Sequence, residues 1–245
     1  MSSQTRIEVH REGDRVRVRT THRCEPDRPA IRPMLIETTV NGAVISLVPE
    51  GALLLAGDDI LVDITVGPGA HLDLREAAGT VAYAMRGSSA RWSTRIVLGA
   101  GAGLTWAGEA FVAAAGSRSE RLTEIVLGSG ATAAIRELLV LGRHGEAGGA
   151  LRNALRVRRA DGTPLLVEDL VLDESTPSHV LGPHRAIGTV ALFGAELPEN
   201  LPGTRLDLDG GWGTVVRWLA GTAHEIDVSA AWLGCQTVAP GHEGG

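Results

Sequence analysis

The turn Gly67-Pro68-Gly69-Ala70 recurs twice further along the chain, as Gly99-Ala100-Gly101-Ala102 and Gly128-Ser129-Gly130-Ala131. These G-x-G-A turns are 32 and 29 residues apart, and each follows a short β-branched run such as Ile64-Thr65-Val66. After each turn comes a run in which apolar and polar residues alternate, such as residues 71–75. Alternation with a period of two, interrupted by Gly-rich turns, is typical of half-buried antiparallel strands. The three units therefore predict stacked hairpins with one continuous core, because one hairpin buries too little surface alone.

Each unit leaves through a second loop, at residues 76–90, 107–119 and 142–150. If the stack is regular, these loops lie along one edge of the protein. Loops held on a rigid β scaffold commonly carry binding surfaces. The repeat is also compatible with architecture alone, without a functional role.

The segments outside the repeat complete a mostly β domain. Hairpins are predicted over residues 6–23, around Glu12-Gly13-Asp14, over 35–47, around Asn41-Gly42, and over 151–172, around Asp161-Gly162. We expect irregular loops over 173–185 and 194–211, a strand over 186–193, a short helix over 215–224, a final strand near 226–233 and a mobile tail over 240–245. The prediction is a single domain over 1–245 with its core at about 33–233. Its antiparallel strands or hairpins stack in β-helix-like or superhelical layers, with one or two short helices.

Composition excludes several classes of function. All 23 basic residues are arginine, so chemistry that requires a lysine is absent. The net charge of −6 argues against a nucleic-acid partner. Hydrophobic runs are too short to span a membrane, and no apolar leader is seen. The two cysteines, Cys24 and Cys235, form no disulfide framework, so we expect a cytoplasmic protein.

Two neighbouring carboxylates, Asp58 and Asp59, directly precede a predicted strand. Adjacent acids can bind a cation or act as an acid–base pair, and they can also be a solvated polar turn. On a strand the two side chains would point to opposite faces, so only one of them could line a buried site.

The loop over residues 142–149 is the densest polar loop of the chain and contains Arg143, His144 and Glu146. No nucleophile stands beside these residues, so they do not form a catalytic triad. A partner-docking loop, a metal-transfer loop and an ordinary solvated turn all remain open. The pairs His22/Cys24 and His179/His184 have no closed zinc-site spacing.

Five segments of the chain share the order and spacing of segments in a known family: Gly51 to Asp58, Ala77 to Tyr83, Trp106 to Phe111, Arg136 to Glu146 and Gly162 to Leu170. Together they resemble the UreD (UreH) family of urease accessory proteins, over about Pro33 to Ala223. Two departures concern local loops: Ala56 stands where the family usually has glycine, and Trp106-Ala107-Gly108-Glu109-Ala110 replaces a proline-rich turn.

The resemblance implies a non-enzymatic maturation factor for a nickel enzyme. It implies partners: UreF, the GTPase UreG through UreF, and apo-urease. It also implies that nickel passes transiently through an internal channel and that no cofactor is held tightly. Asp58 and Glu168 would then be acidic stations of the nickel relay, Thr80 would shape the channel, and Arg143 and Glu146 would brace their loop or a partner contact.

Two alternatives compete with this hypothesis. A β-solenoid enzyme acting on a polysaccharide could use Asp58 with Asp59 or Glu168 with Asp169, although the chain has few of the aromatics that usually line such clefts. A structural β module without a metal role is the other.

Overall fold

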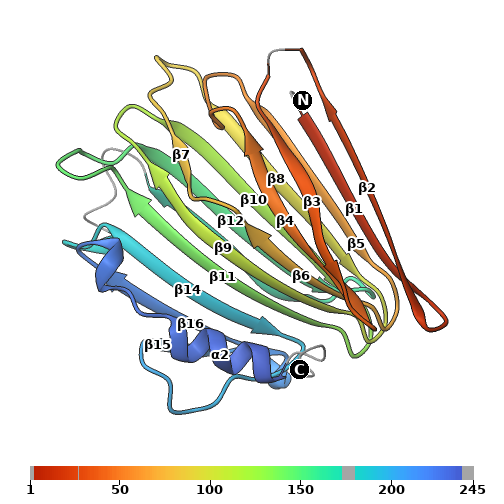
Figure 1. The fold of residues 1–245 in the computed structure, drawn as a ribbon. Helices are drawn as coiled ribbons and strands as arrows, with labels where there is room; N and C mark the ends of the chain where they lie inside the picture. The colour runs from red at the N-terminus through yellow and green to blue at the C-terminus, as the bar shows by residue number, and fades with distance from the viewer. Residues whose placement is uncertain (1–2, 27, 173–179, 239–245) are drawn as a thin grey trace.

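The computed structural model describes residues 3–26, 28–172 and 180–238 of the chain. They form a sandwich of two β-sheets with one α-helix on an outer face (Figure 1). The seven-stranded sheet has the order β13-β12-β10-β8-β5-β1-β2, and the second sheet the order β15-β16-β14-β11-β9-β6-β4-β3, with β7 added beside β9. The prediction of a mostly β fold in stacked, β-helix-like layers is confirmed.

The strands of the seven-stranded sheet are β1 (Ser3–Glu12), β2 (Arg15–Cys24), β5 (Asp59–Val66), β8 (Ala90–Leu98), β10 (Arg118–Leu127), β12 (Ala150–Arg159) and β13 (Pro164–Leu172). Those of the second sheet are β3 (Ala30–Thr38), β4 (Gly42–Glu50), β6 (His71–Glu76), β7 (Thr80–Ala82), β9 (Gly103–Ala113), β11 (Thr132–Leu141), β14 (Ala186–Phe193), β15 (Thr204–Asp207) and β16 (Gly213–Ala220). The helix α2 covers Ser229–Val238, and the short 3₁₀ turns η1 and η2 cover Asp209–Gly211 and Ala223–Glu225.

Each G-x-G-A turn carries the chain from one sheet to the other, from β5 to β6, from β8 to β9 and from β10 to β11. Equivalent strands of successive units then pair in parallel, as β5, β8 and β10 do in the seven-stranded sheet. The prediction of antiparallel pairing inside the repeat is therefore wrong, although the hairpins β1/β2, β3/β4 and β12/β13 are antiparallel. A period of two shows that a strand has one buried face, and it does not show which strand lies beside it.

The two glycines of each turn have different physical roles. A Cβ on Gly128 would lie 2.6 Å from the backbone carbon of Gly99 in the turn below, because the turns stack in direct contact. The second glycine has a left-handed backbone, with φ of +66° at Gly130, which glycine adopts without steric cost. The turns are also linked by hydrogen bonds, such as that from the Gly101 amide to the Ser129 carbonyl. The first glycine of the motif is therefore required for the close stacking of successive turns, and the second for the backbone conformation of the turn.

The main core fills the space between the two sheets and draws on nearly every strand. The alternation in β8 is complete: Trp92, Ile96 and Leu98 are buried, while Arg91, Arg95 and Val97 are exposed. One buried and one exposed face on a strand explain the alternation of apolar and polar residues in the sequence of the repeat.

The C-terminal part differs from the prediction. Residues 215–220, the first part of the helix expected over 215–224, instead belong to β16, which extends the second sheet by pairing with β14. Residues 229–233, expected in a strand, begin α2. The helix covers the outer face of the second sheet, where Trp232 and Cys235 pack against a small apolar cluster that includes Val190 and Val216 (Figure 1). A β-branched pair, Val215-Val216, inside an existing sheet overrides weak helical periodicity.

The loops at the other ends of the repeat strands do lie along one edge. The Met85 amide donates to the Gly116 carbonyl, and the amides of Gly142 and Gly149 both donate to the Ala113 carbonyl. Residues 107–113, expected in a loop, instead belong to β9. Most of the loop predicted over 173–185 and the tail over 240–245 fall outside the described residues. In the part of the chain that is described, no helix has the length and apolarity needed to cross a membrane.

Candidate functional site

Asp58 lies immediately before β5 and is almost completely buried, with 2 % of its surface exposed. Its Oδ2 accepts a hydrogen bond of 2.8 Å from the Leu55 amide, which closes a tight loop in which Leu54 has a φ of +57°. Arg28 forms an ion pair with Asp58, with 3.5 Å between its Nη1 and Oδ1. Among the described residues, none forms a hydrogen bond with that buried Oδ1 atom. Asp58 therefore stabilises the loop through Oδ2, whereas Oδ1 has the ion pair with Arg28 and accepts no hydrogen bond from a described residue.

The two acidic pairs considered for a glycosidase mechanism do not form facing carboxylates. Asp59 is more exposed than Asp58 and follows it along an extended chain. Glu168 binds Arg217 of the other sheet at 2.9 and 3.0 Å, whereas Asp169 binds Arg152 on the outer face. Glycosidase carboxylates flank one scissile bond from opposite sides, and neither pair has that geometry.

The loop after β11 is held by two arginines. Arg143 donates to the Glu146 carboxylate at 2.9 Å, and this hydrogen bond holds the pKa of the Glu146 carboxyl below its usual range. Arg185 donates to the carbonyl of Leu141 at 2.7 Å and also to that of Glu146.

Thr80 is buried at the start of β7, which pairs with β9. Within the described residues, no three His, Cys, Asp or Glu side chains gather as they would around a metal ion.

A layer of charged and polar side chains crosses the interior between the two sheets. Glu137 on β11 accepts a hydrogen bond of 2.7 Å from Arg121 on β10 and one of 2.9 Å from Asn153 on β12. Next to it in register, Thr189 and then Arg217 continue the same row across β14 and β16. We call Glu76, Arg121, Glu137, Asn153, Glu168 and Arg217 the interior polar layer.

Glu76 lies at the end of β6 and borders the same interior space. It accepts hydrogen bonds from the Trp106 indole at 3.2 Å and from the Glu109 amide at 3.0 Å. Burial raises the pKa of the Glu76 carboxyl, and the charge of Arg121 and the two hydrogen bonds oppose that rise only in part. Arg121 also stacks over Phe111, with 4.7 Å from its guanidinium carbon to the ring centroid.

A small cavity connects these groups. It is lined by Glu76, Arg121, Glu137, Asn153 and Thr189 among others, and it offers about 30 Å³ to the centres of water molecules. A volume of that size holds about two waters, and the polar lining provides hydrogen-bond partners for them. The sandwich thus contains a polar, hydratable space bounded by carboxylates.

Sequence reasoning identified only Glu168 of this layer. A signal was nevertheless present, because Arg121, Glu137 and Asn153 stand at positions where the alternation requires an inward-facing residue. Asn153 lies between the inward residues Leu151 and Leu155 on β12. Polar residues at such positions are paired with one another when they occur, and only the structure shows with which partner.

Comparison with known proteins gives the family of the chain. A family model described as "UreD urease accessory protein" matches residues 2–242. The chain belongs to the UreD family of urease accessory proteins. "Urease accessory protein UreD 1" of Streptomyces griseus is 44 % identical over 191 residues, which cover 76 % of this chain and 74 % of that relative.

Other relatives agree with the UreD assignment. "Urease accessory protein UreD" of Frankia casuarinae is 36 % identical over 72 % of this chain and 60 % of its own length. "Urease accessory protein UreD 3" of Streptomyces griseus is 38 % identical over 66 % of this chain and 67 % of its own length. The resemblance found in the sequence alone is confirmed, and these relatives are named as accessory proteins.

Proposed function

We propose that this UreD-family chain is a urease maturation factor without catalytic activity of its own. It binds UreF, recruits the GTPase UreG through UreF, contacts apo-urease and guides nickel towards the urease active site in the cytoplasm. Family membership supports the role in urease maturation. The partners and the passage of nickel are proposals that the following observations support.

The observation that best supports passage of nickel is the interior polar layer with its small cavity. Carboxylates of the second sheet, Glu76 and Glu137, face one hydratable space together with Arg121 and Asn153 of the other sheet. Glu168 on β13, which is paired with Arg217 on β16, extends the polar row beyond that space. A path for a cation through an otherwise apolar sandwich requires such groups, because a cation in an apolar interior loses its hydration without compensation.

The chemistry of the layer suits transit better than storage. Carboxylates and water hold divalent nickel with modest affinity, whereas clusters of Cys and His would retain it. In addition, each interior carboxylate is already partnered, Glu137 by Arg121 and Glu168 by Arg217. Cargo would compete with these guanidinium groups at every step, which keeps the affinity low. Nickel is therefore treated as transient cargo and no resident cofactor is proposed.

We propose roles for the residues singled out in the sequence on the same basis. Asp58, whose buried Oδ1 accepts no hydrogen bond from a described residue, and Glu168 are stations for the cation, and Thr80 shapes the route. Arg143 and Glu146 brace the loop that follows β11. Glu137 is a third station for the cation, because it lies at the centre of the interior polar layer.

The test is co-expression of the tagged chain with UreF and UreG, affinity capture, mass determination and addition of apo-urease. The proposal predicts a stable complex that captures apo-urease and activates it with nickel. Glu137→Gln and Glu168→Gln should lower the rate of nickel loading at least tenfold while the complex still forms.

The matched control is Glu124→Gln, a carboxylate on the outer face that is paired with Arg95 and Arg156. It should load urease as the wild type does. Unchanged loading with both interior variants would refute the conduit and leave the scaffold intact. Failure to capture any partner would refute the scaffold as well.

A further inference from the structure

The outer face of the β1/β2 hairpin carries three exposed arginines that line one hollow. Several arginines elsewhere on this face are paired with acids, Arg91 with Glu120 at 2.9 Å and Arg95 with Glu124 at 3.7 Å, for example. By contrast, we find no ion pair from a described carboxylate to Arg6, Arg19 or Arg23, which we call the arginine triad. All three side chains are exposed.

The acids nearest in register do not neutralise the triad. Glu8 stands opposite Arg19, but no ion pair joins them. Asp63 on β5 stands beside Arg6 in register, yet it accepts a hydrogen bond of 2.8 Å from the Gln4 amide. Three guanidinium groups are thus left with free donors on a chain whose net charge is −6.

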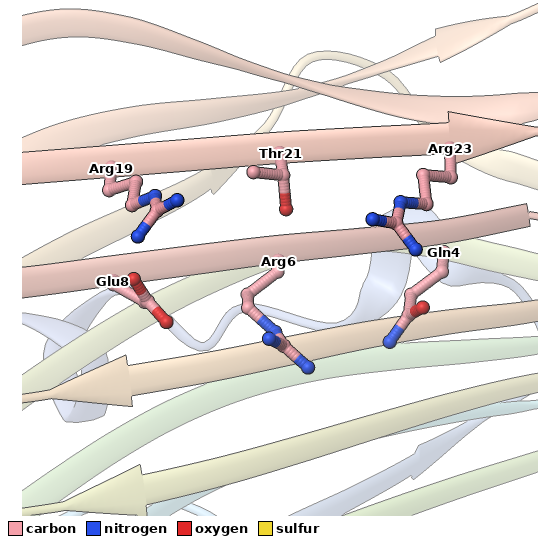
Figure 2. A pocket seen from close by; sticks show the side chains of 6 residues that line it. All are labelled: Gln4, Arg6, Glu8, Arg19, Thr21 and Arg23. Atoms are coloured by element: carbon pink, nitrogen blue, oxygen red, sulfur yellow. The ribbon is translucent and has the colours of Figure 1, made fainter.

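The triad surrounds a shallow hollow of about 190 Å³ that Gln4, Glu8 and Thr21 complete (Figure 2). Figure 2 shows Arg19 and Arg23 on one strand with Thr21 between them, and Arg6 on the neighbouring strand below Thr21. The guanidinium groups stay apart instead of converging on one point. The hollow is therefore a row of three sites and not a pocket for a single small anion.

We propose that the arginine triad docks an extended acidic segment of a partner protein, with carboxylates at alternate residues. Successive same-face positions of a strand are about 6.6 Å apart, which is the spacing from residue 19 to 21 and from 21 to 23. Arg6 lies on the neighbouring strand opposite Thr21, so it provides the guanidinium group for the position between Arg19 and Arg23. An extended peptide repeats its same-face side chains at that spacing too, so three alternate carboxylates meet the three guanidinium groups in order.

The surroundings favour a short acidic peptide over a nucleic acid. A polyanion would continue past the triad onto the rest of the sheet, where Glu120, Glu124 and Asp169 alternate with the arginines. Those carboxylates repel a long phosphate backbone, whereas a segment of about five residues ends before it reaches them. Arg17, at the turn end of the hairpin, is already paired with Glu12, which limits the site on that side.

The experiment titrates the full chain, in its accessory complex, against fluorescein-labelled peptides at about 150 mM ionic strength, where the Debye length is about 8 Å. One probe carries three aspartates at alternate positions in a serine background. The second has the same composition with its aspartates adjacent. We expect the alternating peptide to bind at least tenfold more tightly than the adjacent one.

The variant that removes the site is Arg6→Gln with Arg19→Gln and Arg23→Gln, and it should weaken binding of the alternating peptide at least tenfold. The matched control, Arg91→Gln with Arg95→Gln and Arg156→Gln, removes three charges from the same face and should change affinity less than twofold. Equal losses in both variants, or equal affinity for the two peptides, would overturn the proposal. Tighter binding of a single-stranded oligonucleotide than of the alternating peptide would assign the triad to nucleic acid instead.

Discussion

The interior polar layer and the arginine triad use the same chemical groups in opposite ways. Inside the sandwich, Arg121 and Arg217 each bind a carboxylate that comes from the other sheet. On the β1/β2 hairpin, the three arginines of the triad face water and form no ion pair with a described acid. Burial explains the difference: an unpaired charge between the sheets is strongly destabilising, whereas water solvates an unpaired guanidinium outside at little cost. Pairing is therefore obligatory inside, and its absence outside leaves donors free for a partner.

The largest effect should come from Arg121→Met. Only 10 % of the Arg121 side chain is exposed, and without it Glu137 keeps one neutral partner, Asn153, for a buried charge. Breaking a buried pair in this way costs about 3–5 kcal/mol of unfolding free energy. Urea unfolding followed by tryptophan fluorescence measures the loss. A cost below 1 kcal/mol would mean that the interior layer is far more hydrated than its burial indicates.

A smaller loss is expected for Arg217→Met at the open end of the layer. Both partners of the Arg217–Glu168 pair are about one quarter exposed, so water partly replaces the lost interaction. We expect a cost of about 1–2 kcal/mol in the same urea assay. If Arg217→Met lowered the unfolding free energy as much as Arg121→Met does, water would be excluded equally along the whole interior polar layer.

Glu76→Gln tests the interior through pH. Burial raises the pKa of Glu76, so the folded protein binds a proton at a higher pH than the unfolded chain does. The stabilisation from this proton is complete below the unfolded pKa and is lost as pH rises through the folded pKa. The wild type should therefore gain stability relative to Glu76→Gln as the pH is lowered from 7 towards 4. Parallel stability curves for the two proteins over that range would contradict the raised pKa.

The sequence was sufficient for the fold class and the family and insufficient for the interior. Alternation and the G-x-G-A turns predicted strands at nearly the right residues, because burial of one face acts locally on each strand. Parallel pairing was missed, since the partner of a strand such as β8 is about 30 residues away, a distance that alternation does not report. Arg121 and Glu137 were missed for a related reason, since their meeting depends on two strands from different sheets.

The ion pairs on the outer face of the seven-stranded sheet, which we call the outer ladder, should tolerate the loss of a single arginine. Arg95 is more than half exposed and lies 3.7 Å from Glu124, which also has Arg156 nearby. We expect Arg95→Gln to change the unfolding free energy by less than about 0.5 kcal/mol, as for most exposed ion pairs. A larger loss would show that the ladder acts as a cooperative network across the parallel strands.

The smallest effect, and the one with the opposite sign, should come from removing the arginine triad. Arg6, Arg19 and Arg23 repel one another, and no described acid forms an ion pair with any of them. The triple glutamine variant should therefore be as stable as the wild type or slightly more stable, within about 0.5 kcal/mol. Salt screens like-charge repulsion, so any gain should shrink as the ionic strength rises from 10 mM to 1 M. Urea unfolding at both ionic strengths checks this. A clear destabilisation that persists in high salt would show that the three arginines hold the hairpin through their packing, and the contrast with the interior layer would then no longer rest on charge.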